Sequence, residues 1–158
     1  VELDENTGLK GMHFLCAEDN ELNAEILSEL LEIEGASCEI CENGQVVVER
    51  FEQSKPGEFD MILMDVQMPI MNGYEATKAI RSGTHPLAKT IPIIAMTANA
   101  FSEDIQNSLN AGMDAHVSKP VDMKTLIKTV HSIQSGVWGG RNLRRNDTWL
   151  SFGQIVQK

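Results

Sequence analysis

The chain has 158 residues, which is enough for one well-packed domain but not for two complete ones. Its composition, 42% hydrophobic and 23% charged residues, is typical of a globular protein, and no apolar run approaches the roughly 18 residues of a membrane span. The formal net charge of -10 argues against a nucleic-acid surface, because phosphate backbones are bound by clustered Lys and Arg. We therefore expect this domain to contact neither nucleic acid nor membrane.

The cysteine content indicates reduced thiols. Three cysteines, Cys16, Cys38 and Cys41, do not make a disulfide scaffold, so we expect a cytoplasmic location, although a longer parent protein could be membrane-anchored. Cys38 and Cys41 form a C-x-x-C within a predicted strand, where a spacing of three puts the side chains on opposite faces. We interpret both as structural residues rather than as a metal-binding or redox pair.

Short apolar runs alternate along the chain with longer amphipathic segments, which is typical of β-α units wound onto a parallel sheet. The first strand is predicted at residues 12–17, and the first helix at residues 20–35. Four apolar residues of this helix recur at helical spacing: Leu22, Ile26, Leu30 and Ile33. Gly35 is expected to end the helix.

The same alternation continues through four further strands and helices. Strands are predicted at residues 37–41, 59–65, 91–97 and 114–120. Helices are predicted at residues 44–53, 73–83, 102–112 and 122–133. Because crossovers between parallel strands are right-handed, the pattern favours an α/β fold with a doubly wound, five-stranded parallel sheet and helices on both faces.

Polar residues stand at the ends of four predicted strands. In chain order they are Glu18, Asp19, Asp65, Thr97 and Lys119. Because the carboxyl ends of parallel strands lie at one edge of the sheet, we expect these side chains to meet in a crevice there. The sequence thus predicts a binding site at this edge.

The residue types at this edge indicate phosphoryl chemistry. Three carboxylates repel one another unless a cation joins them, and oxygen ligands alone favour Mg²⁺. Lys119 and Thr97 are suited to bind oxygens of a phosphoryl group carried by Asp65, whose carboxylate can attack phosphorus to form an acyl phosphate. Each residue alone has an ordinary explanation as a helix cap or turn former, so the combination carries the hypothesis.

Four segments match the blocks of a known family, in order and with suitable separations. They are AEDNELN (17–23), MILMDVQMPIMNGYEATKAIR (61–81), IIAMTANAF (93–101) and AGMDAHVSKPVD (111–122). Over residues 10–134 the chain resembles the response-regulator receiver domains of two-component phosphorelays, particularly those attached to hybrid sensor histidine kinases. The resemblance implies a flavodoxin-like sheet with strand order 2-1-3-4-5.

The two ends of the chain fall outside this resemblance. Residues 1–9 would be an N-terminal extension. Residues 136–158 contain both tryptophans and four Lys/Arg against one acidic residue, the reverse of the charge balance before them. We expect residues 135–158 to form a C-terminal tail that is disordered or artificially appended, without a DNA-binding output module.

The resemblance assigns roles at the predicted site. Asp65 would be the phosphoacceptor, taking a phosphoryl group from a phosphohistidine on a histidine kinase or a histidine phosphotransfer protein. Glu18, Asp19, Asp65 and the backbone carbonyl of Gln67 would hold Mg²⁺. Such a domain would catalyse its own phosphorylation and dephosphorylation, which leaves open whether it should be called an enzyme.

The resemblance also implies a switch. Thr97 and Lys119 would bind the phosphoryl oxygens, and the peptide between Lys119 and Pro120 is often cis in the family. Three residues before the lysine, the family usually has an aromatic ring that swings inward with the threonine, whereas this chain has His116. Either the imidazole takes part in switching, which could then depend on pH, or it is an exposed strand-end residue.

The family's usual docking mode predicts where a phosphohistidine partner binds. The partner would approach the loops that follow the strands, beside the first helix. The residues expected to contact it are Asn20, Leu22, Asn23 and Pro120. Such encounters are modest in area and transient.

Two other functions compete with this interpretation. The first is an aspartyl-nucleophile phosphatase or phosphotransferase. Such enzymes generally have a second acid two residues beyond the nucleophile for acid-base catalysis, and this chain has Gln67 there. The second is a receiver-like interaction module that no longer accepts phosphate, which the presence of the whole polar set disfavours.

Overall fold

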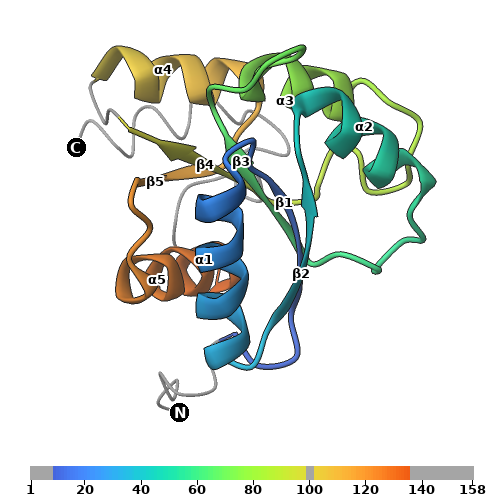
Figure 1. Cartoon of the computed structure of the whole chain (residues 1–158). Coiled ribbons are helices and arrows are strands. Elements are labelled where there is room, and N and C mark those ends of the chain that lie inside the picture. Colours follow the sequence, from blue (N-terminus) through green and yellow to red (C-terminus); the bar gives the residue numbers. More distant parts are fainter. Residues whose placement is uncertain (1–8, 99–101, 136–158) are drawn as a thin grey trace.

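The computed structural model describes residues 9–98 and 102–135, which form a five-stranded parallel sheet between two layers of helices (Figure 1). The elements, in chain order, are β1 (His13–Ala17), α1 (Glu21–Ile33), β2 (Ser37–Cys41), α2 (Gly44–Gln53), β3 (Met61–Asp65), α3 (Gly73–Arg81), β4 (Ile93–Thr97), α4 (Ser102–Ala111), β5 (Ala115–Ser118) and α5 (Met123–Ser135). The strand order is β2-β1-β3-β4-β5. The predicted fold class is confirmed.

Side chains alternate between two cores, one on each face of the sheet. Helices α1 and α5 cover one face, and α2, α3 and α4 cover the other (Figure 1). The first core includes Phe14 and Leu31, and the second includes Leu15, Phe51 and Ile80. Because β1, β3 and β4 lie between two helical layers, they are apolar on both faces, as central parallel strands usually are.

The apolar series that predicted α1 lies mostly on its outer surface. The buried face of α1 consists of Ala24, Leu27 and Leu31. By contrast, Leu22, Ile26 and Ile33 are 64%, 46% and 77% exposed. The helix is therefore apolar on two sides, and the sheet covers only one of them.

Asparagine caps begin three helices at the site edge of the sheet. The side chains of Asn20, Asn43 and Asn72 accept hydrogen bonds from the third backbone N–H group of α1, α2 and α3. Asn72 also forms a capping box, because Glu75 accepts a hydrogen bond from its backbone in return. These caps hold the short loops after β1, β2 and β3 in place.

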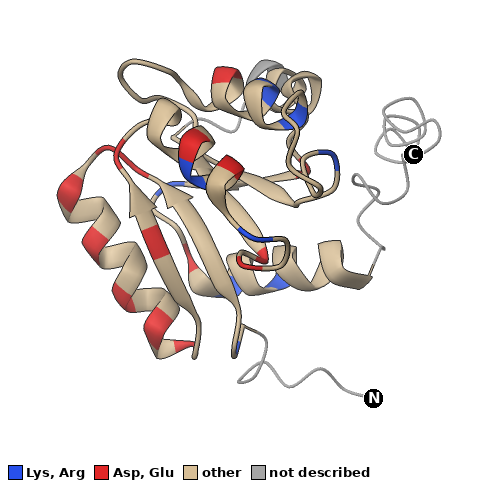
Figure 2. Ribbon diagram, turned by 90° about the vertical axis from the view of Figure 1, so that its right-hand side faces the viewer, with Lys and Arg blue, Asp and Glu red and all other residues tan. Residues whose placement is uncertain are grey.

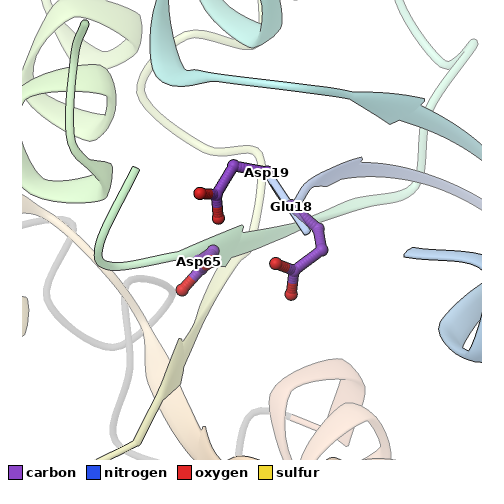
Figure 3. A group of neighbouring side chains, drawn as sticks. All are labelled: Glu18, Asp19 and Asp65. Carbon is purple, nitrogen blue, oxygen red and sulfur yellow. The ribbon is translucent and has the colours of Figure 1, made fainter. Parts of the chain in front are cut away.

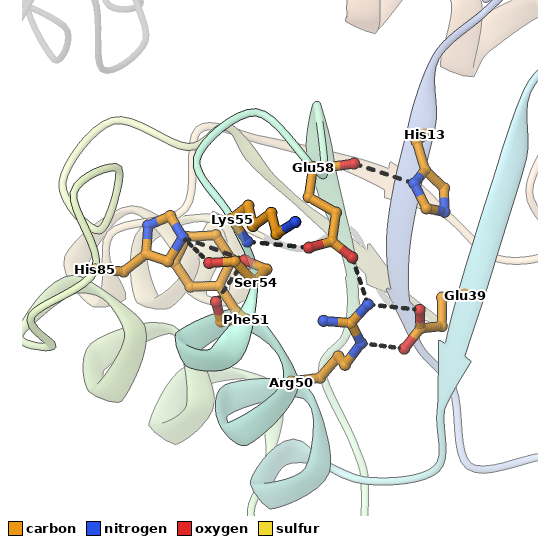
Figure 4. A network of polar contacts seen from close by, with 8 residues as sticks. All are labelled: His13, Glu39, Arg50, Phe51, Ser54, Lys55, Glu58 and His85. Carbon is orange, nitrogen blue, oxygen red and sulfur yellow. Dashed lines mark hydrogen bonds and ion pairs between the residues drawn. The ribbon is translucent and has the colours of Figure 1, made fainter.

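Arg50 connects α2 to the outer strand of the sheet (Figure 4). Its guanidinium contacts the carboxylate of Glu39 on β2 and lies 2.6 Å from that of Glu58 in the loop before β3. The carbonyl oxygen of Glu58 lies 3.0 Å from Nδ1 of His13 on β1. These groups are partly exposed, so we attribute to them the position of α2 rather than a large share of the stability.

Arg81, at the end of α3, forms a buried ion pair, in contrast to the partly exposed ion pairs of Arg50. It is 8% exposed, and its Nη2 lies 3.0 Å from Oδ2 of Asp114, which is 1% exposed. The same guanidinium donates hydrogen bonds to the backbone carbonyls of Ala88, Ile91 and Gly112. One side chain thus joins α3, the loop before β4 and the turn between α4 and β5.

The ends of the described chain differ slightly from the expected domain boundaries. Leu9, assigned above to an N-terminal extension, is fully buried in the core beneath α1 and α5. Helix α5 includes Ser135, and the rest of the predicted tail, residues 136–158, lies outside the described residues. Within the described part of the chain, no helix has the length and apolarity needed to cross a membrane.

Replacing Arg81 by Met should test the buried ion pair. The variant leaves the carboxylate of Asp114 buried without its counter-charge, so we expect the free energy of unfolding to fall by about 3–5 kcal/mol in urea denaturation. Arg50→Met is the matched control, and its partly exposed pairs should cost about 1 kcal/mol or less. Equal small losses in both variants would contradict this role of Arg81.

Candidate functional site

All five polar residues predicted to meet do line one cavity. This cavity, of about 260 Å³, lies at the carboxyl edge of the sheet. The predicted residues lining it are Glu18, Asp19, Asp65, Thr97 and Lys119, together with Asn20, Asn23 and Gln67. Asp65 and Thr97 are the last residues of β3 and β4, and the others follow the ends of β1, β3 and β5. The parallel topology therefore brings them together, while their roles stay a prediction.

Three carboxylates form the centre of this cavity (Figure 3). Glu18, Asp19 and Asp65 each offer an oxygen atom, and these atoms lie within 4.8 Å of one another. Asp19 is exposed, whereas Glu18 and Asp65 are only 3% and 4% exposed. Carboxylates this close and this buried need a positive partner, because water screens them little.

Lys119 provides that positive charge. Its Nζ lies 3.0 Å from Oε1 of Glu18 and 3.2 Å from Oδ2 of Asp65. Its backbone N–H donates a 2.8 Å hydrogen bond to the carbonyl of Thr97, and the peptide to Pro120 is cis. Burial opposes the charged form, but the hydrogen bond to Glu18 and the charge of Asp65 outweigh it and raise the pKa of Lys119.

The carboxylate of Asp65 is harder to ionise than a carboxylate in water. Burial is the largest cause and, with the neighbouring charge of Glu18, raises the pKa of Asp65 to about 6, although Lys119 opposes the rise. The negative charge on Asp65 is thus only partly compensated in the protein alone. A further positive group at this position would stabilise the ionised form.

Gly73 allows the loop after β3 to close tightly against Asp65. A Cβ atom on Gly73 would lie 2.3 Å from the carbonyl oxygen of Asp65, a distance that real Cβ atoms do not reach. The N–H of Gly73 donates to the carbonyl of Val66, and the N–H of Val66 donates to that of Met96. The sequence analysis did not identify this requirement, because it depends on how closely the loop after β3 approaches Asp65.

A second cavity, of about 330 Å³, adjoins the first along α1. It shares Glu18, Asn23 and Lys119 with the first cavity, and its other walls are largely apolar. These walls are Ile26, Leu27, Leu30, Met96, Pro120 and Val121. Sequence reasoning did not foresee that Ile26 and Leu30 line a groove beside the site, although both belong to the apolar series that predicted α1.

Two predicted residues lie away from both cavities. Leu22 is exposed on the first turn of α1. His116 lies within β5, pairs with Ala95 of β4 and is half-buried, rather than exposed at a strand end. Its neighbours Ala115 and Val117 point into the core beneath α1 and α5, so His116 faces the α4 side. Burial lowers the pKa of His116.

Comparison with known proteins identifies the family. The sequence profile of the response regulator receiver domain matches residues 14–131. The chain belongs to the receiver-domain family. It is 35% identical over 147 residues to probable histidine kinase 2 of Oryza sativa subsp. indica, covering 86% of this chain and 14% of the relative. It is 37% identical over 131 residues to the sensor protein GacS of Pseudomonas syringae pv. syringae, covering 82% of this chain and 14% of the relative.

Solved structures agree with this assignment. The receiver domain of the sensor histidine kinase PA1611 from Pseudomonas aeruginosa, with a magnesium ion in its active-site cleft, superposes with a TM-score of 0.69 at 33% identity, covering 78% of this chain and 98% of that one. The receiver domain of Saccharomyces cerevisiae Ssk1, in complex with the phosphotransfer protein Ypd1, gives 0.68 at 28% identity, covering 78% and 89%. This receiver domain is thus a component of a His-Asp phosphorelay.

The raised pKa of Asp65 predicts how stability changes with pH. The folded receiver keeps this proton up to about pH 6, whereas the unfolded chain releases it near pH 4, so ionisation disfavours folding progressively across that interval. In metal-free buffer, Asp65→Asn should therefore be more stable than wild type at pH 7, by on the order of 1 kcal/mol or more. The advantage should shrink toward pH 4 in urea denaturation.

Glu42→Gln is the matched control for this comparison. Glu42 is an exposed carboxylate in the turn after β2, so the substitution should leave the pH dependence unchanged. An advantage of Asp65→Asn that is the same at pH 4 and pH 7 would contradict the raised pKa.

Proposed function

We propose that Asp65 is the phosphoacceptor of this receiver domain and takes its phosphoryl group from a phosphohistidine in a Mg²⁺-dependent reaction. The observation that carries this proposal is the contact of one ammonium group, Nζ of Lys119, with both Glu18 and Asp65 beside the open cavity. This arrangement offers a nucleophilic carboxylate, a positive charge for phosphoryl oxygens and acidic ligands for a cation in one place.

The donor set fits Mg²⁺. It comprises the three clustered carboxylates, and Gln67 lines the same cavity, where its backbone carbonyl would be the fourth protein ligand. Hard oxygen donors with room for water are what Mg²⁺ requires, and Mg²⁺ bound here would offset negative charge on the carboxylates and the phosphoryl group. The related PA1611 receiver domain contains magnesium in its active-site cleft, which supports the proposal.

Asp65, Lys119 and Thr97 have different roles in the proposed phosphoryl transfer. A carboxylate oxygen of Asp65 attacks phosphorus, the P–O bond forms, and the P–N bond to the histidine breaks, leaving the electron pair on the imidazole nitrogen. Lys119 is already in contact with Asp65, so its ammonium lies beside the phosphoryl oxygens as charge develops on them. Thr97 ends β4 and lines the same cavity, and in this proposal its hydroxyl donates a hydrogen bond to one of those oxygens.

An intact-mass experiment tests the phosphoacceptor. The protein is incubated with acetyl phosphate and Mg²⁺, and we expect a single added phosphoryl group in wild type. Asp65→Asn should not be labelled, because an amide oxygen is a poor nucleophile toward phosphorus, and EDTA should suppress labelling of wild type. Equal labelling of Asp65→Asn would overturn the assignment of Asp65.

Two further results would favour the competing functions. Repeated hydrolysis of a phosphomonoester such as p-nitrophenyl phosphate would indicate a phosphatase, which the amide of Gln67 disfavours because it cannot act as a general acid. Lack of labelling in wild type at saturating Mg²⁺ would indicate an interaction module without phosphoacceptance. Either result would contradict the proposed function.

We infer that the phosphohistidine partner docks on α1 and the groove beside it. Asn23 and Pro120 line this groove, Asn20 caps α1 next to the acidic residues, and Leu22 and Ile26 expose apolar surface on the same helix. Acidic residues run along the exposed side of α1 (Figure 2). A partner with an apolar contact patch flanked by Lys or Arg fits this surface, and the partner would be a histidine kinase or a histidine phosphotransfer protein.

Leu22→Glu should separate docking from chemistry. Transfer from a phosphorylated histidine phosphotransfer protein should slow about tenfold or more, because a charge enters the apolar contact, whereas labelling by acetyl phosphate should not change. Ile33→Glu is the matched control, since Ile33 is equally apolar and 77% exposed but lies at the far end of α1, about 16 Å away. Equal effects of both variants would contradict docking at the first turn.

The chain spans about one seventh of the length of the rice and Pseudomonas syringae relatives. We propose that residues 10–134 act as the receiver module of a hybrid histidine kinase on the cytoplasmic side. We include in this proposal a role of His116 in switching, which its place on the α4 side of β5 supports.

A further inference from the structure

A cluster of two thiols and a hydroxyl lies between α1 and the outer strand β2. Cys38 is partly exposed on β2, and its Sγ lies 3.0 Å from Oγ of Ser28 on α1. Cys38 pairs with Phe14 of β1, so Cys16 lies two residues further along β1 on the same face. Both thiols pack into the core beneath α1, whereas Cys41 packs into the other core. The C-x-x-C residues do lie on opposite faces, as predicted.

We propose that Cys38 is a nucleophilic thiol and a site of oxidation by hydrogen peroxide to a sulfenic acid. This inference is independent of phosphoacceptance, because the cluster shares no residue with the acidic cavity. It also revises the interpretation of Cys38 as merely structural.

The surroundings of Cys38 favour its thiolate. The hydroxyl of Ser28 and the thiol of Cys16 can both donate hydrogen bonds to the sulfur, and such bonds stabilise the ionised form. Hydrogen bonding from Cys16 is the largest cause that lowers the pKa of Cys38 to about 6, with Ser28 and the charge of His13 acting in the same direction. Burial and the carboxylate of Glu32 on α1 oppose this shift.

Cys16 and Cys41 have neither a lowered pKa nor access to a reagent, the two conditions for a reactive thiol. Burial raises the pKa of Cys16 well above its ordinary value and that of Cys41 to about 11, so near neutral pH both remain protonated. Cys16 is 0% and Cys41 is 3% exposed, which denies a reagent access. Since only an accessible thiolate reacts readily, Cys38 should be the selective target.

The oxidation balances without any further reactant. The Cys38 thiolate attacks one oxygen of hydrogen peroxide, an S–O bond forms, the O–O bond breaks, and hydroxide leaves and is protonated to water. Two electrons pass from sulfur to peroxide, and the product is the sulfenic acid.

Trapping the sulfenic acid tests the proposal. The reduced full-length chain is treated with a small excess of hydrogen peroxide in the presence of dimedone, and its peptides are mapped by mass spectrometry. We expect a dimedone adduct on Cys38 and none on Cys16 or Cys41. Cys38→Ser should abolish labelling, whereas Cys41→Ser and Asp65→Asn should be labelled like wild type. Labelling that persists in Cys38→Ser, or no adduct on Cys38 in wild type, would overturn the proposal.

Alkylation by iodoacetamide tests the cause. The rate of alkylation of Cys38 should rise with a midpoint near pH 6, set by its pKa. Ser28→Ala should raise this midpoint by about one pH unit, the expected effect of losing a hydrogen bond to a charged group. Ser37→Ala, which changes an exposed serine next to Cys38, should leave it unchanged. A midpoint near pH 9 in wild type would overturn the proposal.

Discussion

The mutual repulsion of buried carboxylates is the constraint on which this receiver domain depends. Glu18 and Asp65 are almost fully buried at neighbouring strand ends, and Lys119 is the cation that lies between them. A parallel sheet can bring such groups together from segments about 100 residues apart in the sequence, because every strand ends at the same edge. The rest of the fold, including the capped loops and the close approach of Gly73, holds that edge in a fixed geometry.

The fold and the meeting of the polar residues could be predicted because both follow from local patterns. Apolar runs and amphipathic segments indicated each strand and helix, and the position of Asp65 or Thr97 at the end of a run implied its place on the sheet edge. The resemblance to receiver domains added the strand order, which no local pattern contains. The strand order was then sufficient to predict which residues meet at the edge of the sheet, without knowledge of any side-chain contact.

Other features depend on contacts between distant segments and could not be predicted in this way. The apolar series of α1 indicated a helix, but periodicity alone does not show that Leu31 is buried against the core while Leu22 and Ile33 are exposed. The requirement for Gly73 arises from the path of the loop after β3. The C-x-x-C spacing correctly predicted that Cys38 and Cys41 lie on opposite faces of β2, but the environment of Cys38 depends on Ser28 from another element and could not be predicted from that spacing.

The contact between Arg50 and Glu39 lies at one edge of the sheet. β2 lies at the border of the sheet, where one row of backbone N–H and C=O groups remains open to a strand from another molecule. Glu39 places a charge in the middle of β2, and Arg50 fixes it there. An incoming strand would have to cover these charged groups, which discourages sheet extension into fibrils. A weak surface ion pair can thus protect against aggregation while adding little to folding.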